Sequence, residues 1–364
     1  MAEKKAVNKV VEPTNEEIDA HVDQLVAKAQ VALSKFEEFT QEQVDYIVAK
    51  CSVAGLDAHG TLAEAAVNET GRGVFEDKAV KNLFACEYVT SNLRHLKTVG
   101  IINEDPLLGI TEIAEPVGVV CGIVPTTNPT STVIFKSLIC LKTRNPIIFS
   151  FHPSAHACSV MAAVVIRDAA IAAGAPEDCI QWLDLKSMYA TTALMKHPGV
   201  ATILATGGNA MVAAAYSCGK PALGVGAGNV PAYVEKTCVL PRAVNDIVLS
   251  KSFDNGMICA SEQAAIVDTE IYDAFMKEIK RFKVYFVNKE EKAKLETFMF
   301  GAVAYSDNVN AAKLNPNVVG KPATWIAEQA GFKVPEDTQI ICAECKEVGP
   351  NEPLTREKLS PVLA

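Results

Sequence analysis

The fold class of this chain is decided by residues 111–150, which read TEIAEPVGVVCGIVPTTNPTSTVIFKSLICLKTRNPIIFS. Residues 111–125 are rich in β-branched side chains and predict a strand. Residues 131–143 predict a helix, and residues 145–150 predict a second, short apolar strand. Short apolar strands separated by helices are typical of a parallel sheet that is covered on both faces, so the stretch predicts an α/β fold.

The same alternation continues along the chain. The expected strands lie at residues 179–185, 200–206 and 221–227, and the expected helices at residues 154–174, 187–197, 209–219 and 241–253. Two amphipathic helices precede the sheet, at residues 18–33 and 37–56, and Thr40 followed by Glu42 and Gln43 predicts a cap of the second. Residues 264–282 and the strand-like residues 338–345 predict the start of a second lobe.

The composition excludes several function classes. The chain has 364 residues, of which 49% are hydrophobic and 21% charged, so it is long enough for two domains. Its net charge of −9, without a long run of Lys or Arg, argues against nucleic-acid binding. Its eleven cysteines are scattered and odd in number, and residues 1–17 lack the apolar core of a signal peptide, so we expect reduced thiols in the cytoplasm. The apolar residues 161–175 contain Arg167 and Asp168, and we expect no membrane-spanning run.

Asn128 is a candidate functional residue at the start of a helix. It precedes Pro129, and proline is favoured in the first helical turn, so we expect Asn128 to cap a helix that begins near Thr130. The amide of Asn128 can either cap this helix or point at an anion in a cleft.

Glycines follow two of the expected strands. Gly207 and Gly208 lie between a strand and a helix, where backbone amides meet a phosphate or a nicotinamide, and Gly224, Gly226 and Gly228 have G-x-G-x-G spacing. Neither group has the G-x-G-x-x-G spacing of the common dinucleotide fingerprint. Tight packing of a strand against a helix is the alternative interpretation.

Two pairs of residues have the sequence spacing of metal ligands. His152 and His156 are four residues apart, but Pro153 and the lack of a nearby carboxylate or thiolate favour a capping histidine. Cys342 and Cys345 have C-x-x-C spacing without a second pair, and we interpret them as half-buried strand cysteines. We therefore expect no metal in this chain.

Cys259 lies in the polar stretch SKSFDNGMICASEQ, residues 250–263, and looks presented to solvent. A nucleophilic cysteine needs a lowered pKa or a neighbouring base, and no histidine lies within sixty residues of it. A structural thiol in a loop is the alternative.

Four motifs together resemble one family: residues 123–150, ILATGGNAMV (203–212), KPALGVGAGN (220–229) and KSFDNGMICASEQ (251–263). They closely resemble the acetaldehyde dehydrogenase half of bifunctional aldehyde–alcohol dehydrogenases, within the aldehyde dehydrogenase superfamily, from about Val22 to the last residue. The resemblance implies an NAD-binding domain with a helical N-terminal segment at residues 1–249 and a catalytic lobe at residues 250–364. Members of the family first complete the aldehyde dehydrogenase module and then continue with an iron-dependent alcohol dehydrogenase, so we expect the catalytic lobe here to be incomplete at its C-terminus.

The resemblance also implies roles for single residues. Cys259 matches the nucleophile, and Asn128 matches the amide that stabilises the oxyanion. Gly208 and Gly226, beside Gly207, match backbone contacts to NAD, and Glu357 matches the residue that holds the cofactor ribose. The segment that contacts the cofactor is matched by Ile123, Val124, Pro125, Thr126, Thr127 and Asn128.

One departure from the superfamily bears on the reaction. Enzymes that release free acids carry a Glu general base where this chain has Ala222, and no Asp or Glu lies between Leu185 and Val234. We therefore expect a CoA-acylating acetaldehyde dehydrogenase that interconverts acetyl-CoA and acetaldehyde with NAD and CoA. Its partners are small molecules, with a homo-oligomer or filament expected from the full-length relatives. The alternatives are a non-acylating aldehyde dehydrogenase and an inactive fragment with an assembly role.

Overall fold

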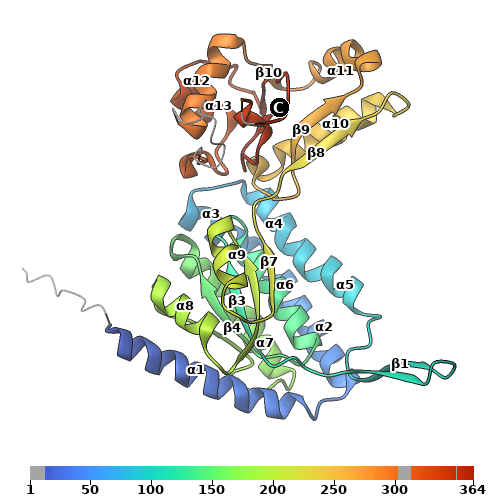
Figure 1. Cartoon of the computed structure of the whole chain (residues 1–364), viewed down its shortest axis with the longest axis vertical. Coiled ribbons are helices and arrows are strands. Elements are labelled where there is room, and N and C mark those ends of the chain that lie inside the picture. Colours follow the sequence, from blue (N-terminus) through green and yellow to red (C-terminus); the bar gives the residue numbers. More distant parts are fainter. Residues whose placement is uncertain (1–12, 302–312, 350) are drawn as a thin grey trace, which may run out of the picture.

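The computed structural model describes residues 13–301, 313–349 and 351–364, so the first twelve residues of the expected NAD-binding domain lie outside the described residues. Five parallel strands form its largest sheet, in the order β5-β4-β3-β6-β7 (Figure 1). These strands are β3 (Val119–Val124), β4 (Ile147–Phe151), β5 (Ile180–Trp182), β6 (Val200–Thr206) and β7 (Ala222–Val225), of which Figure 1 labels β3, β4 and β7. The predicted parallel sheet is thus confirmed.

The inner strands β3 and β4 are buried along their whole length, as expected for a sheet covered on both faces, whereas the edge strand β7 exposes Leu223 and Val225. In β3, Val119, Cys121 and Ile123 join the core on one face, while Val120 and Val124 join the core on the other. The first core also contains residues of α1 (Asn15–Phe36) and α8 (Met188–Lys196). The second contains residues of α2 (Gln41–Asp57), α6 (Pro129–Lys142) and α7 (His156–Ala172).

The predicted helix boundaries agree closely with the structure. Thr40 is the N-cap of α2 and forms the predicted capping box with Gln43. The remaining helices of this lobe are α3 (His59–Thr70), α4 (Phe75–Leu83), α5 (Val89–Leu93) and α9 (Asn209–Tyr216). A turn of π-helix, Phe84–Tyr88, joins α4 to α5.

We expected no apolar run long enough to span a membrane, and by the criteria of length and hydropathy alone this expectation was wrong. The helical segment Pro153–Ala172 meets both criteria. However, α7 packs against α2 and α6 and buries Ala162, Ala163 and Ile166 in the core. One face of α7 thus packs into the core of this lobe, while Arg167 and Asp168 pair with each other at 2.7 Å on the solvent-exposed side.

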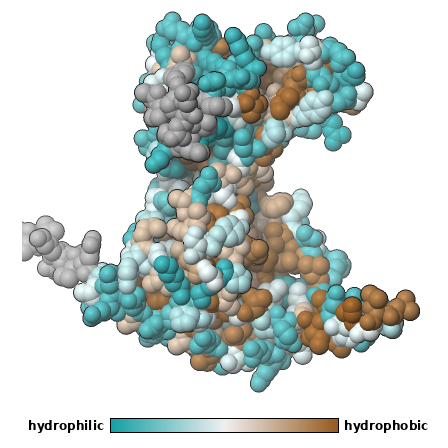
Figure 2. Space-filling model, viewed as in Figure 1, coloured by the Kyte–Doolittle hydropathy of each residue, from teal (hydrophilic) through white to brown (hydrophobic). Residues whose placement is uncertain are grey.

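The expected strand at residues 111–125 is two strands. Pro116 lies between β2 (Ile110–Ala114) and β3, and β2 pairs antiparallel with β1 (Gly100–Asp105), which we did not predict. The resulting hairpin projects from the lobe (Figures 1 and 2). Its exposed apolar side chains are Ile101, Ile102, Leu107, Leu108, Ile110 and Ile113.

The second lobe has its own sheets and cores. It contains the parallel sheet β10-β11-β12 and the parallel pair β8-β9. The strands are β8 (Val230–Val234), β9 (Glu262–Val267), β10 (Val284–Phe286), β11 (Ile340–Cys342) and β12 (Val362–Leu363). The helices are α10 (Leu240–Ser252), α11 (Tyr272–Ile279), α12 (Lys289–Phe300) and α13 (Ala323–Ala330).

The boundary expected between residues 249 and 250 stays a prediction, and the packing favours an earlier one. Val244, Ile247 and Val248 of α10 share a core with Phe275 and Ile340 of the second lobe. Because β8 and α10 both belong to that lobe's packing, we propose residues 226–229, between β7 and β8, as the boundary.

Candidate active site

A cavity of about 690 Å³ lies at the carboxyl ends of β3, β4, β6 and β7. The connection after β4 leads outward to β5, whereas β6 returns to the other side of β3. The order of the strands therefore reverses beside β3, and such switch points are where open α/β sheets bind ligands.

All of the site residues that the resemblance assigned lie together in this cavity. Its lining includes Ile123, Val124, Pro125, Thr126, Thr127, Asn128, Gly207, Gly208, Gly226, Cys259 and Glu357. They come from both lobes, because Cys259 and Glu357 follow the boundary at β8 while the others precede it.

Cys259 is exposed, in the loop between a 3-10 turn, Phe253–Gly256, and β9. Asp254 and Asn255 in that turn have φ angles of 49° and 53°, a left-handed conformation that non-glycine residues adopt at a cost. Gly228 packs directly against the loop, and a Cβ there would lie 2.3 Å from the carbonyl oxygen of Cys259. The position of Cys259 is therefore fixed by its neighbours.

Asn128 is the N-cap residue of α6 by position, but the expected side-chain cap was wrong. Its side chain makes no hydrogen bond to the first turn of α6. Instead Oδ1 accepts from Lys81 Nζ at 2.8 Å, and Nδ2 donates to Thr127 Oγ1 at 3.3 Å. The interpretation that remains is that this amide points at an anion in a cleft.

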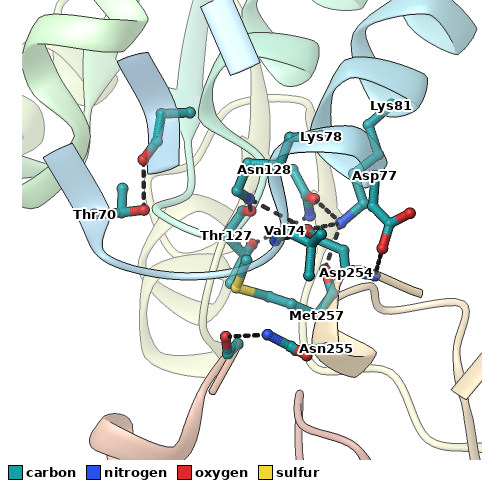
Figure 3. A network of polar contacts seen from close by, with 12 residues as sticks. Thr70, Val74, Asp77, Lys78, Lys81, Thr127, Asn128, Asp254, Asn255 and Met257 are labelled. Atoms are coloured by element: carbon teal, nitrogen blue, oxygen red, sulfur yellow. Dashed lines mark hydrogen bonds and ion pairs between the residues drawn. The ribbon is translucent and has the colours of Figure 1, made fainter. Parts of the chain in front are cut away.

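The lysine that holds Asn128 belongs to a buried polar network of α4 (Figure 3). Lys81 Nζ also donates to Asp254 Oδ2 at 2.5 Å and to the carbonyl of Met257 at 2.8 Å. Lys78 Nζ donates to the same carboxylate oxygen at 3.2 Å and to the carbonyl of Thr127 at 3.1 Å. Burial lowers the pKa of Lys81 to about 8, against the opposing effect of Asp254.

Glu357 supplies the one carboxylate among the described residues that line the cavity. Its Oε1 accepts the backbone N–H of Gly228 at 2.8 Å. Burial raises the pKa of this carboxyl, although the Gly228 N–H and the nearby Lys251 and Lys358 act in the opposite direction.

The residues around α9 fit a dinucleotide. Gly208 is the N-cap of α9 and offers no side-chain cap, so the first N–H groups of the helix have no side-chain partner there. A Cβ on Gly208 would meet nothing within 4 Å, which leaves open space over the helix start. A Cβ on Gly226, directly after β7, would lie 2.8 Å from Asn209 Oδ1, so a larger residue there would have to displace the Asn209 side chain.

Sequence reasoning missed several residues that line the cavity. His152 and Pro153 follow β4, and Lys186 and Ser187 follow β5. These residues could have been predicted to line the site, because the carboxyl ends of neighbouring parallel strands meet at one edge of a sheet. The lysines of α4 gave no such signal, because a lysine on an amphipathic helix usually lies in solvent.

The interpretation of His152 as a capping residue is confirmed, because its Nδ1 accepts from Ser154 N at 3.2 Å. Cys342 is buried within β11, whereas Cys345 lies beyond that strand and is half-buried, so the strand interpretation was wrong for Cys345. In the described parts of the chain no group of three or more His, Cys, Asp or Glu side chains is arranged to hold a metal ion.

Comparisons with known proteins point to one family. The sequence profile of the aldehyde dehydrogenase family matches residues 3–311. Aldehyde-alcohol dehydrogenase 2 of Entamoeba histolytica is 71% identical over 95% of this chain, and the chain spans about 40% of the length of that relative.

Solved structures agree. An acetylating aldehyde dehydrogenase from Geobacillus thermoglucosidasius is 45% identical, with a TM-score of 0.90 over 97% of this chain and 76% of its own. A propionaldehyde dehydrogenase from Rhodopseudomonas palustris, solved with bound propionyl-CoA, is 30% identical, with a TM-score of 0.81 over 94% of this chain and 74% of its own. These likenesses confirm the predicted fold class.

Proposed function

Because the chain belongs to the aldehyde dehydrogenase family, we propose that its cavity carries out CoA-acylating aldehyde oxidation and the reverse reduction. The reaction is acyl-CoA + NADH + H⁺ ⇌ aldehyde + NAD⁺ + CoA, with acetyl-CoA and acetaldehyde as the substrates. The observation that carries this proposal is the cavity itself. Its lining contains the exposed Cys259, the amide of Asn128, which does not cap α6, and, among its described residues, a single carboxylate, that of Glu357.

Cys259 is the nucleophile of the proposed mechanism. In the oxidative direction its thiolate attacks the aldehyde carbonyl and forms a thiohemiacetal, and loss of hydride leaves a thioester on the sulfur. The amide of Asn128 and the backbone N–H of Cys259 donate to the oxygen that becomes negatively charged. The CoA thiol then takes the acyl group and releases Cys259.

The nicotinamide cofactor, when bound, accepts or supplies the hydride. The segment from Ile123 to Asn128, with Gly207, Gly208 and Gly226, would hold it along the carboxyl ends of β3, β6 and β7. The carboxylate of Glu357 is available to accept hydrogen bonds from ribose hydroxyls, with its other oxygen held by Gly228.

Hydrolysis of the thioester is the competing reaction, and the residues that line the cavity in the described ranges offer no free carboxylate to activate water for it. Ala222, at the place of the superfamily's general base, lies in β7 and not among the described residues of the lining. Glu357, the remaining carboxylate, is engaged with Gly228. A positioned base typically contributes about 10²–10⁴ in rate, and we expect water to attack the thioester slowly without one.

The dependence of turnover on CoA tests this function. Enzyme mixed with NAD⁺ and acetaldehyde in the absence of CoA should give a burst of NADH near one per active site and then a much slower phase. Addition of CoA should restore fast turnover, and intact-protein mass spectrometry should show an acetyl adduct that is absent from Cys259→Ala. Steady NADH production with accumulating acetate, equally fast without CoA, would contradict the acylating reaction.

The remaining expectations extend the proposal. We propose acetyl-CoA, acetaldehyde and NAD as its small-molecule partners, cytoplasmic action, and assembly with further copies of the chain. The exposed apolar side chains of the β1–β2 hairpin support assembly, since such patches commonly mark interfaces.

A further inference from the structure

We propose that Lys81 is a positioning residue, which orients the amide of Asn128 toward the reacting oxygen. The inference rests on the proposed function, in which Asn128 donates to the oxyanion. The carrying observation is that Lys81 Nζ donates to Asn128 Oδ1 at 2.8 Å, from a helix 47 residues away in the sequence.

The first step concerns which way the amide points. The two ends of an asparagine amide differ in role, because the oxygen only accepts and the nitrogen only donates. An ammonium group has donors and no acceptor, so the end of Asn128 that faces Lys81 must be the oxygen. The donating nitrogen is thereby turned away from Lys81, and its bond to Thr127 Oγ1 is long at 3.3 Å. One N–H of this nitrogen is left for a ligand in the cavity.

The second step concerns the strength of the donor. The oxygen of Asn128 accepts from a cation whose side chain is 8% exposed. In such surroundings hydrogen bonds polarise one another, and a charge on the oxygen side of an amide makes its N–H a better donor. Lys81 thus acts through Asn128 without touching the substrate.

The third step joins Asn128 to the nucleophile. The same ammonium donates to the carbonyl of Met257, two residues before Cys259, and to Asp254 in the turn that begins this loop. Asp254 is in turn held by the backbone N–H of Val74 at 2.7 Å. One buried cation therefore ties the turn between β3 and α6 to Met257, in the segment that leads to Cys259 (Figure 3).

Stability alone is a weak reason for this arrangement. Burial of two ammonium groups around one carboxylate costs desolvation, and apolar replacements of buried ion pairs are often neutral or stabilising. Lys78 provides a matched comparison in the same network. It binds the same oxygen of Asp254, is also buried on α4, and reaches the backbone of Thr127 but not the side chain of Asn128.

A double-mutant cycle on kcat tests the proposal. Lys81→Met and Asn128→Ala should each lower kcat with a modest change in KM, and Lys81→Met should lose less than the roughly 10²–10³-fold typical of an oxyanion donor. If Lys81 acts through Asn128, its substitution should change kcat little in the Asn128→Ala background. Any loss from Lys78→Met should persist in that background. Independent, additive losses for Lys81 and Asn128 would overturn the proposal.

A measurement without turnover separates this inference from the proposed function. With ¹⁵N-labelled asparagine, the side-chain amide signal of Asn128 is identified by its absence from Asn128→Ala. Lys81→Met should shift this signal and speed exchange of its protons with water, and Lys81→Gln, which keeps a donor without the charge, serves if the first variant does not fold. An Asn128 signal that changes in Lys78→Met but not in either Lys81 variant would refute the positioning role. Wild-type protein without CoA-dependent activity would refute the proposed function and leave this test intact.

Discussion

Gly228 approaches Cys259 so closely that no larger residue fits between them: a Cβ on Gly228 would lie 2.3 Å from the carbonyl oxygen and 3.2 Å from the carbonyl carbon of Cys259. Both contacts are to backbone, which cannot rotate away as a flexible side chain would. The N–H of Gly228 also donates to Glu357. One glycine therefore supports the loop of the proposed nucleophile and the carboxylate of the proposed ribose site together.

Gly228→Ala should accordingly move the Cys259 loop while the protein stays folded. A displacement of about 1 Å at a reacting centre can cost about 10²-fold in rate, and we expect a loss of that order in the CoA-free NADH burst. Gly60→Ala is the control, because a Cβ on Gly60 in α3 meets nothing within 4 Å. It should leave the burst unchanged, because Gly60 lies in the first turn of α3 and does not line the cavity. A Gly228→Ala enzyme with a normal burst would show that the loop accommodates the methyl group.

Cys259 should react first among the eleven cysteines with iodoacetamide. Burial raises the pKa of seven others to about 12, namely Cys51, Cys86, Cys121, Cys140, Cys158, Cys179 and Cys342. The thiolate is the reactive form, so these should label slowly, and Cys218 and Cys238 are the realistic competitors. Peptide mass spectrometry after short exposure gives the order, and NAD⁺ should change the rate at Cys259 only. Faster labelling of Cys342 or Cys345 would argue against Cys259 as the nucleophile.

Asn128→Ala separates catalysis from capping. Loss of an N-cap side chain typically costs about 1 kcal/mol, but Asn128 makes no such bond, so we expect little of that loss. We expect kcat to fall by roughly 10²–10³ while KM changes modestly. Steady-state kinetics and melting temperature on the same preparation decide the matter, since a normal kcat would contradict the role of Asn128 as oxyanion donor, and any fall in melting temperature then reflects the lost bond to Lys81.

The sheet could be predicted because its strands are short apolar runs between helices, and its inner strands β3 and β4 are buried along their whole length. The β1–β2 hairpin and β8 escaped prediction for the opposite reason. The hairpin exposes Ile101 and Ile113 without a buried face, and β8 includes Pro231, which is typical of a sheet edge. Local pattern predicts a strand well where burial dictates the pattern, and poorly where it does not.

The residues of the candidate site likewise fall into those that a local sequence pattern could predict and those that it could not. Cys259 and Asn128 belong to long local motifs, and a resemblance could assign them. The bond between Lys81 and Asn128 joins residues from separate helices, and the sequence around Lys81, FEDKAVKNL, has the charge pattern of a solvated surface. Its burial depends on the turn at Asp254, which lies 173 residues further along the chain. No local pattern contains that information.

Glu357 should make the stability of the protein depend on pH in a particular direction. Burial raises its pKa in the folded protein above the usual 4.5, so between the two values the folded state binds more protons than the unfolded state. Stability contributed by this group is therefore present below about pH 4.5 and is lost as the pH rises through the folded pKa. Glu357→Gln keeps an oxygen for the N–H of Gly228 and removes the titration. Its melting temperature should exceed that of the wild type at neutral pH, and the difference should shrink toward low pH.

Glu352→Gln is the control of opposite sign. Burial alone would raise the pKa of Glu352, but Lys292 at 2.5 Å and the backbone N–H of Lys346 at 3.0 Å outweigh it and lower the pKa. Its stabilising contribution is present above the usual pKa of 4.5 and is lost as the pH falls through the lowered value. Glu352→Gln should therefore melt below the wild type at neutral pH and approach it in acid. If both variants shift the melting temperature in the same direction at every pH, the shift comes from replacing a glutamate by glutamine in general. The prediction that the charged form of Glu357 destabilises the folded protein would then be wrong.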